Sequence, residues 1–390
     1  MSVPVPKTIA EDALGFDLPH RRMEEWRWTD LRQLIDKPYP PRQQVTSQAG
    51  EVQRLLAASL FSGIAATRMV FVNGHYDAAL SKLANGDVKP MAEADEPVQQ
   101  MNVAFATDGA LIRLSGNADT PIELVFLATN AAPRTIATRN VIEVADDASA
   151  TIIETHLGEG SYLANSVTEI RIGHNARLDR VKVEMDSHDA IHLAHCHVTL
   201  ASNVTFRDFT LTTGAKVNRQ NGTYRFTGEF ADGKVSGAYM LAARQHADSR
   251  LVVDHQVANC ASRELFKCVM DDHARGIFQG KVIVRPDAQK TDGKQSSHAL
   301  LLSETSEFDA KPELEIYADD VACGHGATAG DLNPDHVFYL KSRGIPEAEA
   351  KAMLIAAFVG EAFETIHHDS IREALTGFAA RWLTEHRRKG

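Results

Sequence analysis

The sequence predicts a mainly β chain, with a parallel β-helix at its centre and helices on both sides. Residues 111–316 hold many short β-type segments and hardly any helical periodicity. These segments follow one another in a turn-then-strand rhythm. Helical spacing of apolar residues is confined to the first hundred and the last sixty residues. We therefore expect a mostly helical region at 1–104, a β-helix at 105–330 and a helical domain at 331–390.

Composition narrows the classes of function. The chain has 390 residues, 44% of them hydrophobic, and a net charge of −11 from 52 acidic and 41 basic residues. Such an acidic balance argues against a general nucleic-acid or anionic-membrane binder and favours protein partners. No apolar run approaches the ~18 residues that span a bilayer, and MSVPVPKTIAEDALG lacks a secretion-type apolar segment. Four scattered cysteines make a disulfide framework unexpected, so we expect a reducing cytoplasm.

In the first region, apolar residues recur at helical spacing over residues 24–34 and 52–60. An apolar segment at 68–72 then runs into Asn73-Gly74, a pair typical of two-residue hairpin turns. We expect two helices and one hairpin here.

In the central region, three loosely similar stretches each place a small-residue turn before an alternating strand: ASATIIET, HNARLDRVKVE and ASNVTFRDFTL. Short strands alone are equally typical of a sandwich or a barrel. The repeated turn-then-strand order favours a β-helix. Expected strands are 122–127, 141–144, 151–155, 167–172, 178–183, 197–200, 204–211, 223–226, 236–241 and 281–284.

Three helices are expected in the last region. Asn333 is an N-cap followed by proline, and Gly344 ends the helix. A second helix starts at Pro346 and a third follows the capping box at Ser370. The second helix has two adjacent apolar faces, Leu354, Phe358 and Ala362 on one and Ile355, Val359 and Phe363 on the other. Because one intramolecular contact needs a single face, we expect the other to bind a partner.

One stretch carries candidate chemistry. Alternation from residue 311 onward predicts a strand that continues through Ala322, and its end places Cys323 and His325 two positions apart. Side chains at this spacing share a face, and Gly324 and Gly326 leave the histidine little cover.

A thiolate and an imidazole on one face can both bind a metal, although Cys323 could equally be an ordinary buried residue. A structural zinc or an iron–sulfur cluster needs about four protein ligands. Two donors therefore indicate a site that a second protein completes.

The remaining histidine and cysteine motifs give weaker evidence of a functional site. In HLAHCH, His195 and His197 share a strand face while Cys196 points away, so we expect a solvated histidine-rich strand rather than a metal site. Cys260 and Cys268 match no ligand spacing and are expected to be structural.

Two glycine-rich stretches resemble nucleotide-binding loops and are rejected. The loop at 276–281 has too few residues between its glycines, and Val282 stands where Ser or Thr binds Mg²⁺. The glycines around His325 lack a βαβ context. We expect no nucleotide bound by this chain.

Several motifs spread over most of this sequence resemble motifs of the SufB/SufD family. The run ADDVACGHGATAGDL followed by FYLKSRGI is similar to its C-terminal signature, and the likeness continues upstream in VDHQ, GIFQGKVIV, AQKTDGKQ and LLLS. RRMEEWRWTDL at 21–31 is similar to the element that opens the SufD members, which favours that side of the family. Gly324 departs from the serine that SufD members often carry, without removing either ligand-type side chain.

The resemblance implies a right-handed parallel β-helix and a non-enzymatic scaffold for iron–sulfur cluster assembly. It implies a SufB-like partner on the β-helix and a SufC-like ABC-type ATPase, which we expect on the C-terminal domain at Leu354, Phe358 and Val359. Cys323 and His325 are then expected at the SufB-like interface, where they share a nascent cluster or its iron with the partner. A homodimer in the absence of partners stays open.

Two alternatives from other classes stay open at this point. Parallel β-helices also include polysaccharide lyases and hydrolases, which need clustered carboxylates or a basic residue in a groove. Asp319 and Asp320 are adjacent and point to opposite faces, which disfavours such a site. A stand-alone metal-binding module would retain metal as a purified single chain.

Overall fold

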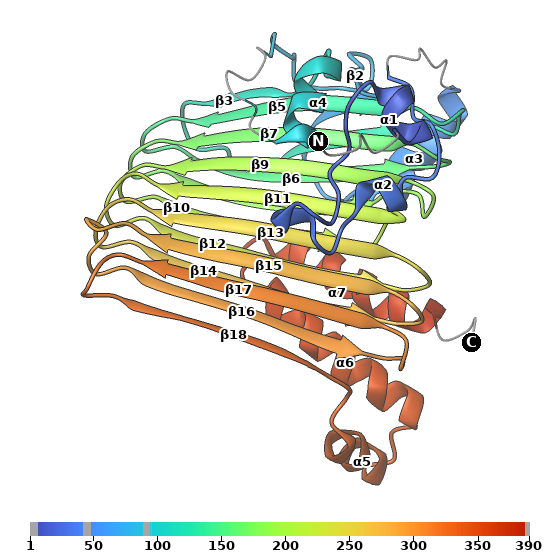
Figure 1. The fold of residues 1–390 in the computed structure, drawn as a ribbon, viewed down its shortest axis with the longest axis vertical. Coiled ribbons are helices and arrows are strands. Elements are labelled where there is room, and N and C mark those ends of the chain that lie inside the picture. The colour runs from blue at the N-terminus through green and yellow to red at the C-terminus, as the bar shows by residue number, and fades with distance from the viewer. Residues whose placement is uncertain (1–6, 42–47, 89–93, 95, 387–390) are drawn as a thin grey trace, which may run out of the picture.

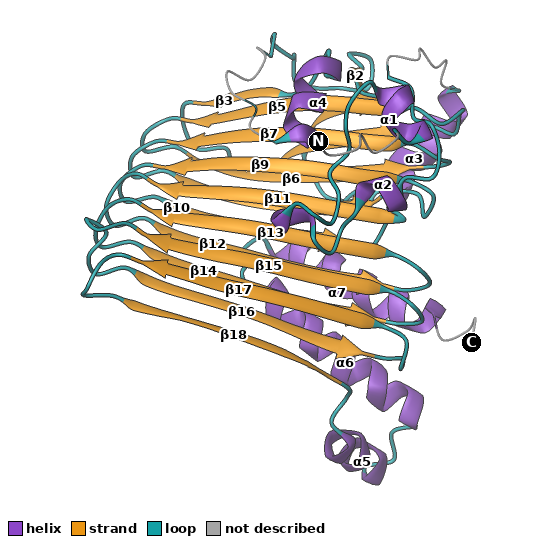
Figure 2. Cartoon of the chain, viewed as in Figure 1, coloured by secondary structure: helices purple, strands orange, loops and turns teal. Residues whose placement is uncertain are grey.

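The computed structural model describes residues 7–41, 48–88, 94 and 96–386. Its centre is a parallel β-solenoid of about eight turns, which confirms the predicted β-helix. Figure 1 shows the strands stacked one above another, with helices near both chain ends. Successive strands alternate between two sheets, so each turn of the solenoid contributes one strand to each sheet (Figure 2).

Within the described residues, the first sheet has ten strands and the second has eight. All strand pairs are parallel except β1 with β2. The first sheet runs β18 (Ala322–Gly330), β16 (Asp292–Leu301), β14 (Ala261–Met270), β12 (Asp232–Leu241), β10 (Thr205–Thr212), β8 (Arg177–Met185), β6 (Ser149–Gly158), β4 (Ile122–Ala128), β1 (Thr67–Val72) and β2 (His75–Tyr76). The second runs β17 (Glu307–Ile316), β15 (Arg275–Val284), β13 (His246–His255), β11 (Val217–Phe226), β9 (Ile191–Leu200), β7 (Leu163–Ile172), β5 (Thr135–Val144) and β3 (Leu111–Leu114).

The loose sequence repeat corresponds to stacked turns. Asp147, Asn175 and Asn203 occupy equivalent turns with φ of 59°, 57° and 59°. Asn and Asp tolerate this left-handed region better than other non-glycine residues. Asn203 Nδ2 donates to Asn175 Oδ1 at 3.0 Å, 28 positions away. Each turn therefore supports the next, which explains why the motif recurs without strict identity.

The N-terminal region packs along the solenoid, from the contact of residues 49–58 with the first strands to the ion pair between Glu24 and Lys311 near its last turn. Its helical segments are α1 (Ile9–Leu14), η1 (Glu24–Trp26), α2 (Leu31–Leu34), α3 (Ala49–Ala58) and α4 (Pro97–Phe105). The single helix expected over 24–34 is wrong, because η1 and α2 are separate elements. The expected hairpin is present, with Asn73 and Gly74 at positive φ between β1 and β2. β1 also pairs with β4, so this region supplies a strand to the solenoid.

The C-terminal domain consists of α5 (Pro334–Ser342), α6 (Glu347–Phe363) and α7 (Asp369–His386). Asn333 caps α5 by accepting a hydrogen bond from the backbone of Asp335, as expected. Helices α6 and α7 pack on the outer face of the ten-stranded sheet, whereas α5 lies beyond the last strands (Figure 1). The third helix begins at Asp369, so Ser370 lies inside it rather than at its N-cap.

The interior of the solenoid holds charges as well as apolar side chains. Arg180 lies between Glu154, at 2.7 Å, and Asp208, at 2.9 Å, and all three side chains are at most 3% exposed. Asp208 on β10 is in register with Arg180 on β8, whereas Glu154 on β6 is in register with Lys182, two residues further along β8, so the parallel pairing brings the opposite charges together. Burial acts to raise the pKa of Glu154, but Arg180 and Lys182 outweigh it and hold this pKa well below its ordinary value.

We expect Arg180→Met to lower the free energy of unfolding by about 3–5 kcal/mol, because it removes the buried cation that Glu154 and Asp208 share. Urea unfolding of both proteins measures this. The control is Arg113→Met, whose partner Glu143 is also a carboxylate but whose side chain is 70% exposed. It should cost at most about 1 kcal/mol. Equal losses in the two variants would contradict the stabilising role of the buried pair.

Candidate functional site

The last strand, β18, forms an open end of the solenoid. It pairs with β16 on one side, and no strand among the described residues pairs with its other edge. The strand sequence, ACGHGATAG, is built from small residues that leave most of its surface exposed. Unpaired backbone groups along such an edge are a ready template for another chain. Figure 1 shows β18 as the lowest strand, from whose end the chain continues to α5.

Cys323 and His325 lie near the start of β18, on one face. The expectation that they end the strand from residue 311 is wrong: β17 stops at Ile316, and the chain turns before β18 begins at Ala322. The turn carries the chain from one sheet to the other. Cys323 pairs in register with Gly293 and His325 with Gln295.

The face that Cys323 and His325 share is the inward face of the solenoid. Cys323 packs against the interior core and is half-buried, whereas His325 is exposed at the open end. An added Cβ at Gly324 or Gly326 would meet no atom within 4 Å. The open end itself therefore leaves the site uncovered, and the glycines are not required for that purpose.

The chemistry of the pair is that of an incomplete ligand set. Burial raises the pKa of the Cys323 thiol above its ordinary value, so the thiol must give up its proton to bind a metal. Among the residues that the structure describes, no group of three or more His, Cys, Asp and Glu side chains is arranged to hold a metal ion. A metal or cluster at Cys323 and His325 would need further ligands from elsewhere.

The other cysteines lie inside the protein. All four cysteines are free. Cys260 and Cys268 are buried in the core, and burial raises the pKa of each. Cys196 faces the solenoid interior beside Arg180, and burial raises its pKa to about 12. Cys323 is thus the one thiol of the four that lies at an open surface.

The HLAHCH strand is not solvated, contrary to expectation. His192 is fully buried, with Nδ1 2.9 Å from Asp186. His195 and His197 do share the opposite face from Cys196, as predicted, but α4 covers them, and Gln99 Nε2 lies 2.9 Å from His195 Nδ1. The sequence could not reveal this cover because α4 is about a hundred residues away.

A polar stack behind the site escaped the sequence reasoning. Glu264 on β14 is in register with Gln295 on β16, which is in register with His325 on β18. Glu264 and Gln295 are 3% and 1% exposed. A signal existed, since Glu264 alternates in phase with Phe266 and Cys268, both core residues. A carboxyl group in phase with the core predicts an inward-facing acid.

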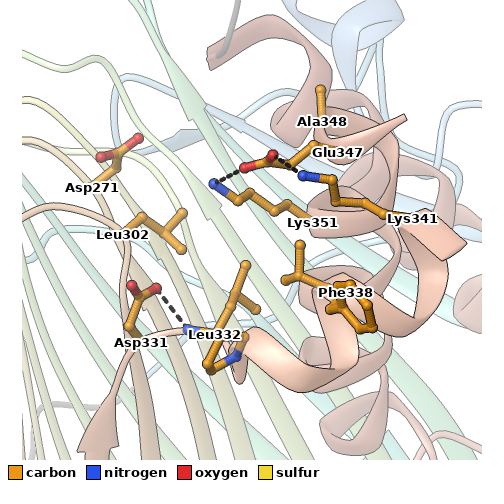
Figure 3. Close-up of a pocket in the computed structure, with 11 residues that line it drawn as sticks. Asp271, Leu302, Asp331, Leu332, Phe338, Lys341, Glu347, Ala348 and Lys351 are labelled. Carbon is orange, nitrogen blue, oxygen red and sulfur yellow. Dashed lines mark hydrogen bonds and ion pairs between the residues drawn. The ribbon is translucent and has the colours of Figure 1, made fainter. Parts of the chain in front are cut away.

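The C-terminal domain offers a second candidate surface. A pocket of about 750 Å³ lies between α5, α6 and the lower end of the solenoid, and Figure 3 shows Lys341 and Lys351 both reaching Glu347 there. Beside it, Phe338 is 72% exposed and Tyr339 57% exposed. The pocket is lined by Asp271, Leu302, Asp331, Leu332, Pro334, Val337, Phe338, Lys341, Glu347, Ala348 and Lys351.

The residues expected to dock an ATPase are mostly engaged within the chain. Val359 is fully buried against the solenoid, so the expectation that it contacts a partner is wrong for this arrangement. Phe358 is half-buried, with the Lys267 ammonium 4.6 Å from its ring centre. Leu354 is half-buried as well, and Met353 beside it is 46% exposed. Both apolar faces of α6 are therefore used largely for packing.

The comparisons with known proteins agree on one family. A family model described as SUF system FeS cluster assembly, SufBD core domain, matches residues 126–358. The iron–sulfur cluster assembly protein SufD of Escherichia coli K12 is 29% identical over 381 residues, which cover 93% of this chain and 89% of that protein. A SufBD family protein of Synechocystis is 30% identical over 402 residues, covering 94% of this chain and 88% of its own length. The chloroplastic protein ABCI7 of Arabidopsis thaliana is 32% identical over 229 residues, covering 57% and 48%.

We expect Cys323 to be the thiol that iodoacetamide modifies first in the native chain, because Cys260 and Cys268 are buried and Cys196 faces the solenoid interior. Its rate should rise about tenfold per pH unit between pH 6 and 8, since only the thiolate reacts and the pKa lies above this range. Mass spectrometry of partially labelled protein measures both. Cys323→Ala should remove the fast phase, and Cys260→Ala should leave it unchanged. A fast phase that persists in Cys323→Ala would contradict the assignment.

Proposed function

The chain belongs to the SufBD family of iron–sulfur cluster assembly proteins, and on that premise we propose that it is a SufD-like, non-enzymatic scaffold subunit. In this proposal it works with a SufB-like subunit and a SufC-like ABC-type ATPase. The ATPase supplies the nucleotide chemistry, and this chain binds no nucleotide itself. The cluster is cargo that passes to other proteins rather than a resident cofactor.

The observation that carries the proposal is the position of Cys323 and His325. They lie near the start of β18, where the solenoid interior opens beside a strand edge that no other described strand pairs with. Two donors fall short of the four that a cluster commonly takes. A partner docked on this end would supply the remaining donors.

The edges of β17 and β18 are the proposed contact with the SufB-like subunit. Both strands stand at the ends of their sheets, so a partner strand can add to either by backbone hydrogen bonds. Added in this way, the partner would cover Cys323 and His325. The same edge would serve a homodimer when the SufB-like subunit is absent.

The proposed docking surface for the ATPase is α5 and the exposed flank of α6. Phe338 on α5 lines the 750 Å³ pocket, and Phe338, Tyr339 on α5 and Met353 on α6 are exposed apolar side chains. Aromatic side chains inserted in a partner's pocket commonly dominate binding energy. This surface replaces the one centred on Phe358 and Val359, which are packed within the chain.

We place the assembly in the cytoplasm. The four free cysteines fit a reducing compartment. Among the described residues, no helix has both the length and the apolar character needed to cross a membrane.

We expect His325→Ala to lower the iron and sulfide content of the purified three-subunit complex several-fold, because it removes a neutral ligand at the cluster position. Cys323→Ala should have a milder effect. The control is Thr328→Ala, on the opposite face of the same strand. All three variants should still co-purify with the partners. Wild-type cluster content in both single variants and in the double variant would refute the ligand role.

We expect the double variant Phe338→Ser, Tyr339→Ser to lose co-purification of the ATPase, because it removes two exposed aromatic anchors. Circular dichroism and unfolding curves should match those of the wild type, since neither side chain supports the core. Ile9→Ser is the control, because Ile9 is 69% exposed but lies in the N-terminal helix α1. Full retention of the ATPase by the double variant would exclude α5 as its docking surface.

A further inference from the structure

The polar stack behind His325 extends the candidate site into the solenoid. Glu264, Gln295 and His325 are in register on three successive strands of one sheet. Neighbouring strands are about 4.8 Å apart, which places Glu264 roughly 10 Å inward from His325. Gly280 on the opposite sheet makes room for this arrangement, since an added Cβ there would lie 2.1 Å from Gln295 Oε1. Gln295 therefore reaches across the interior to the opposite sheet, and its register position lies between those of Glu264 and His325.

The stack is short of hydrogen-bond partners. Among the described residues, neither carboxyl oxygen of Glu264, neither amide atom of Gln295 and not the hydroxyl of Ser297 makes a well-formed hydrogen bond. Ser297 follows Gln295 on the same inward face of β16 and is fully buried. Buried polar groups are ordinarily satisfied by protein or by ordered water. Water that enters from the open end would satisfy these five atoms.

The surroundings of Glu264 keep it uncharged. Burial raises its pKa to about 8, against smaller opposing effects of Ser262 and Arg263. Gln295 from β16 and Cys323 from β18 also face the solenoid interior, and His255 Nε2 from β13 lies 3.1 Å from the Ser262 hydroxyl. Arg263 points outward, where it pairs with Asp292. No cation among the described residues pairs with Glu264, so near pH 7 it is mostly the neutral acid.

We propose that Glu264 is the proton donor that balances the charge of a cation bound at His325. This rests on the proposed function, since it takes His325 to bind iron or a related divalent cation. When the cation arrives, the O–H bond of Glu264 breaks and the carboxylate stays in the interior. The proton leaves to solvent along Gln295, Ser297 and the open end. Glu264 interacts with the bound cation electrostatically, at a distance. It is therefore a positioning residue and not a ligand.

The electric field of a bound divalent cation is strong enough to ionise Glu264 at this distance. A doubly charged ion about 10 Å away, at an effective dielectric constant near 20, lowers the pKa of an acid by roughly two units. Such a shift converts Glu264 from mostly protonated to mostly ionised at pH 7. The site is then uncharged while empty of a cation and gains a compensating negative charge when a cation binds. Cation affinity should accordingly rise with pH up to about 8, because binding releases a proton.

The test measures how many protons are released for each metal ion that binds. Co²⁺ is added to the purified complex under anaerobic conditions in weakly buffered solution at pH 7, with a pH indicator. Wild type should release up to about one more proton per bound Co²⁺ than Glu264→Gln, which cannot ionise. Glu315→Gln is the control, because Glu315 lies on the outer face of β17 and pairs with Lys281. Equal proton release from wild type and Glu264→Gln, with Co²⁺ bound in both, overturns the inference.

A second measurement separates this inference from the proposed function. Loss of Co²⁺ binding in His325→Ala supports the cation site, and unchanged binding counts against it. The variant His325→Lys tests the electrostatic coupling without a metal, because the lysine places a permanent positive charge at the open end. The infrared band of the protonated carboxyl group, which Glu264→Gln should abolish, should then titrate about one pH unit lower than in wild type. An unshifted midpoint overturns the coupling whether or not cobalt binds.

Discussion

The parallel backbone ladder between successive turns of the solenoid is the constraint on which the rest of the structure depends. From β3 to β18, each strand pairs with the equivalent strand of the neighbouring turn, so residues 26 to 32 positions apart stack directly, as Arg180 does with Asp208 and His298 with Thr328. A ladder of this kind has to end. It ends at β18, whose small side chains leave the backbone edge open and leave Cys323 and His325 at the mouth of the interior.

Stacking has opposite electrostatic consequences at the two ends of the interior. In the upper half, it sets Arg180 between Glu154 and Asp208, so charges taken out of water find partners at hydrogen-bond distance. Toward the open end, it sets Glu264 next to Gln295, which carries no charge. A buried carboxylate without a cation is costly, so this acid stays protonated. The same backbone geometry thus produces a rigid ion network in one place and a titratable group in another.

The C-terminal domain shows how packing decides which surface stays free. Helix α6 has two apolar faces, and the fold uses Ile355 and Val359 against the sheet while Phe358 lies under Lys267. Periodicity identifies apolar faces but does not say whether the same chain covers them. Helix α5, with the weaker apolar pattern, is left with Phe338 and Tyr339 in solvent. The partner-binding surface that we propose is therefore set by what the solenoid leaves uncovered.

The sequence by itself predicted the β-helix and the Asn333 cap of α5, and it singled out Cys323 and His325 as candidate ligands, because these follow from local alternation, turn preference and short motifs. It predicted wrongly that these two residues end a strand, since alternation continues through the turn that carries the chain between sheets. Only the tertiary structure decided that α4 covers His195 and that Glu264 and Gln295 stand behind His325. Those contacts join residues some 30 to 100 positions apart, and their register depends on the length of every turn between them. No local pattern carries that information, because it exists only once the ladder has formed.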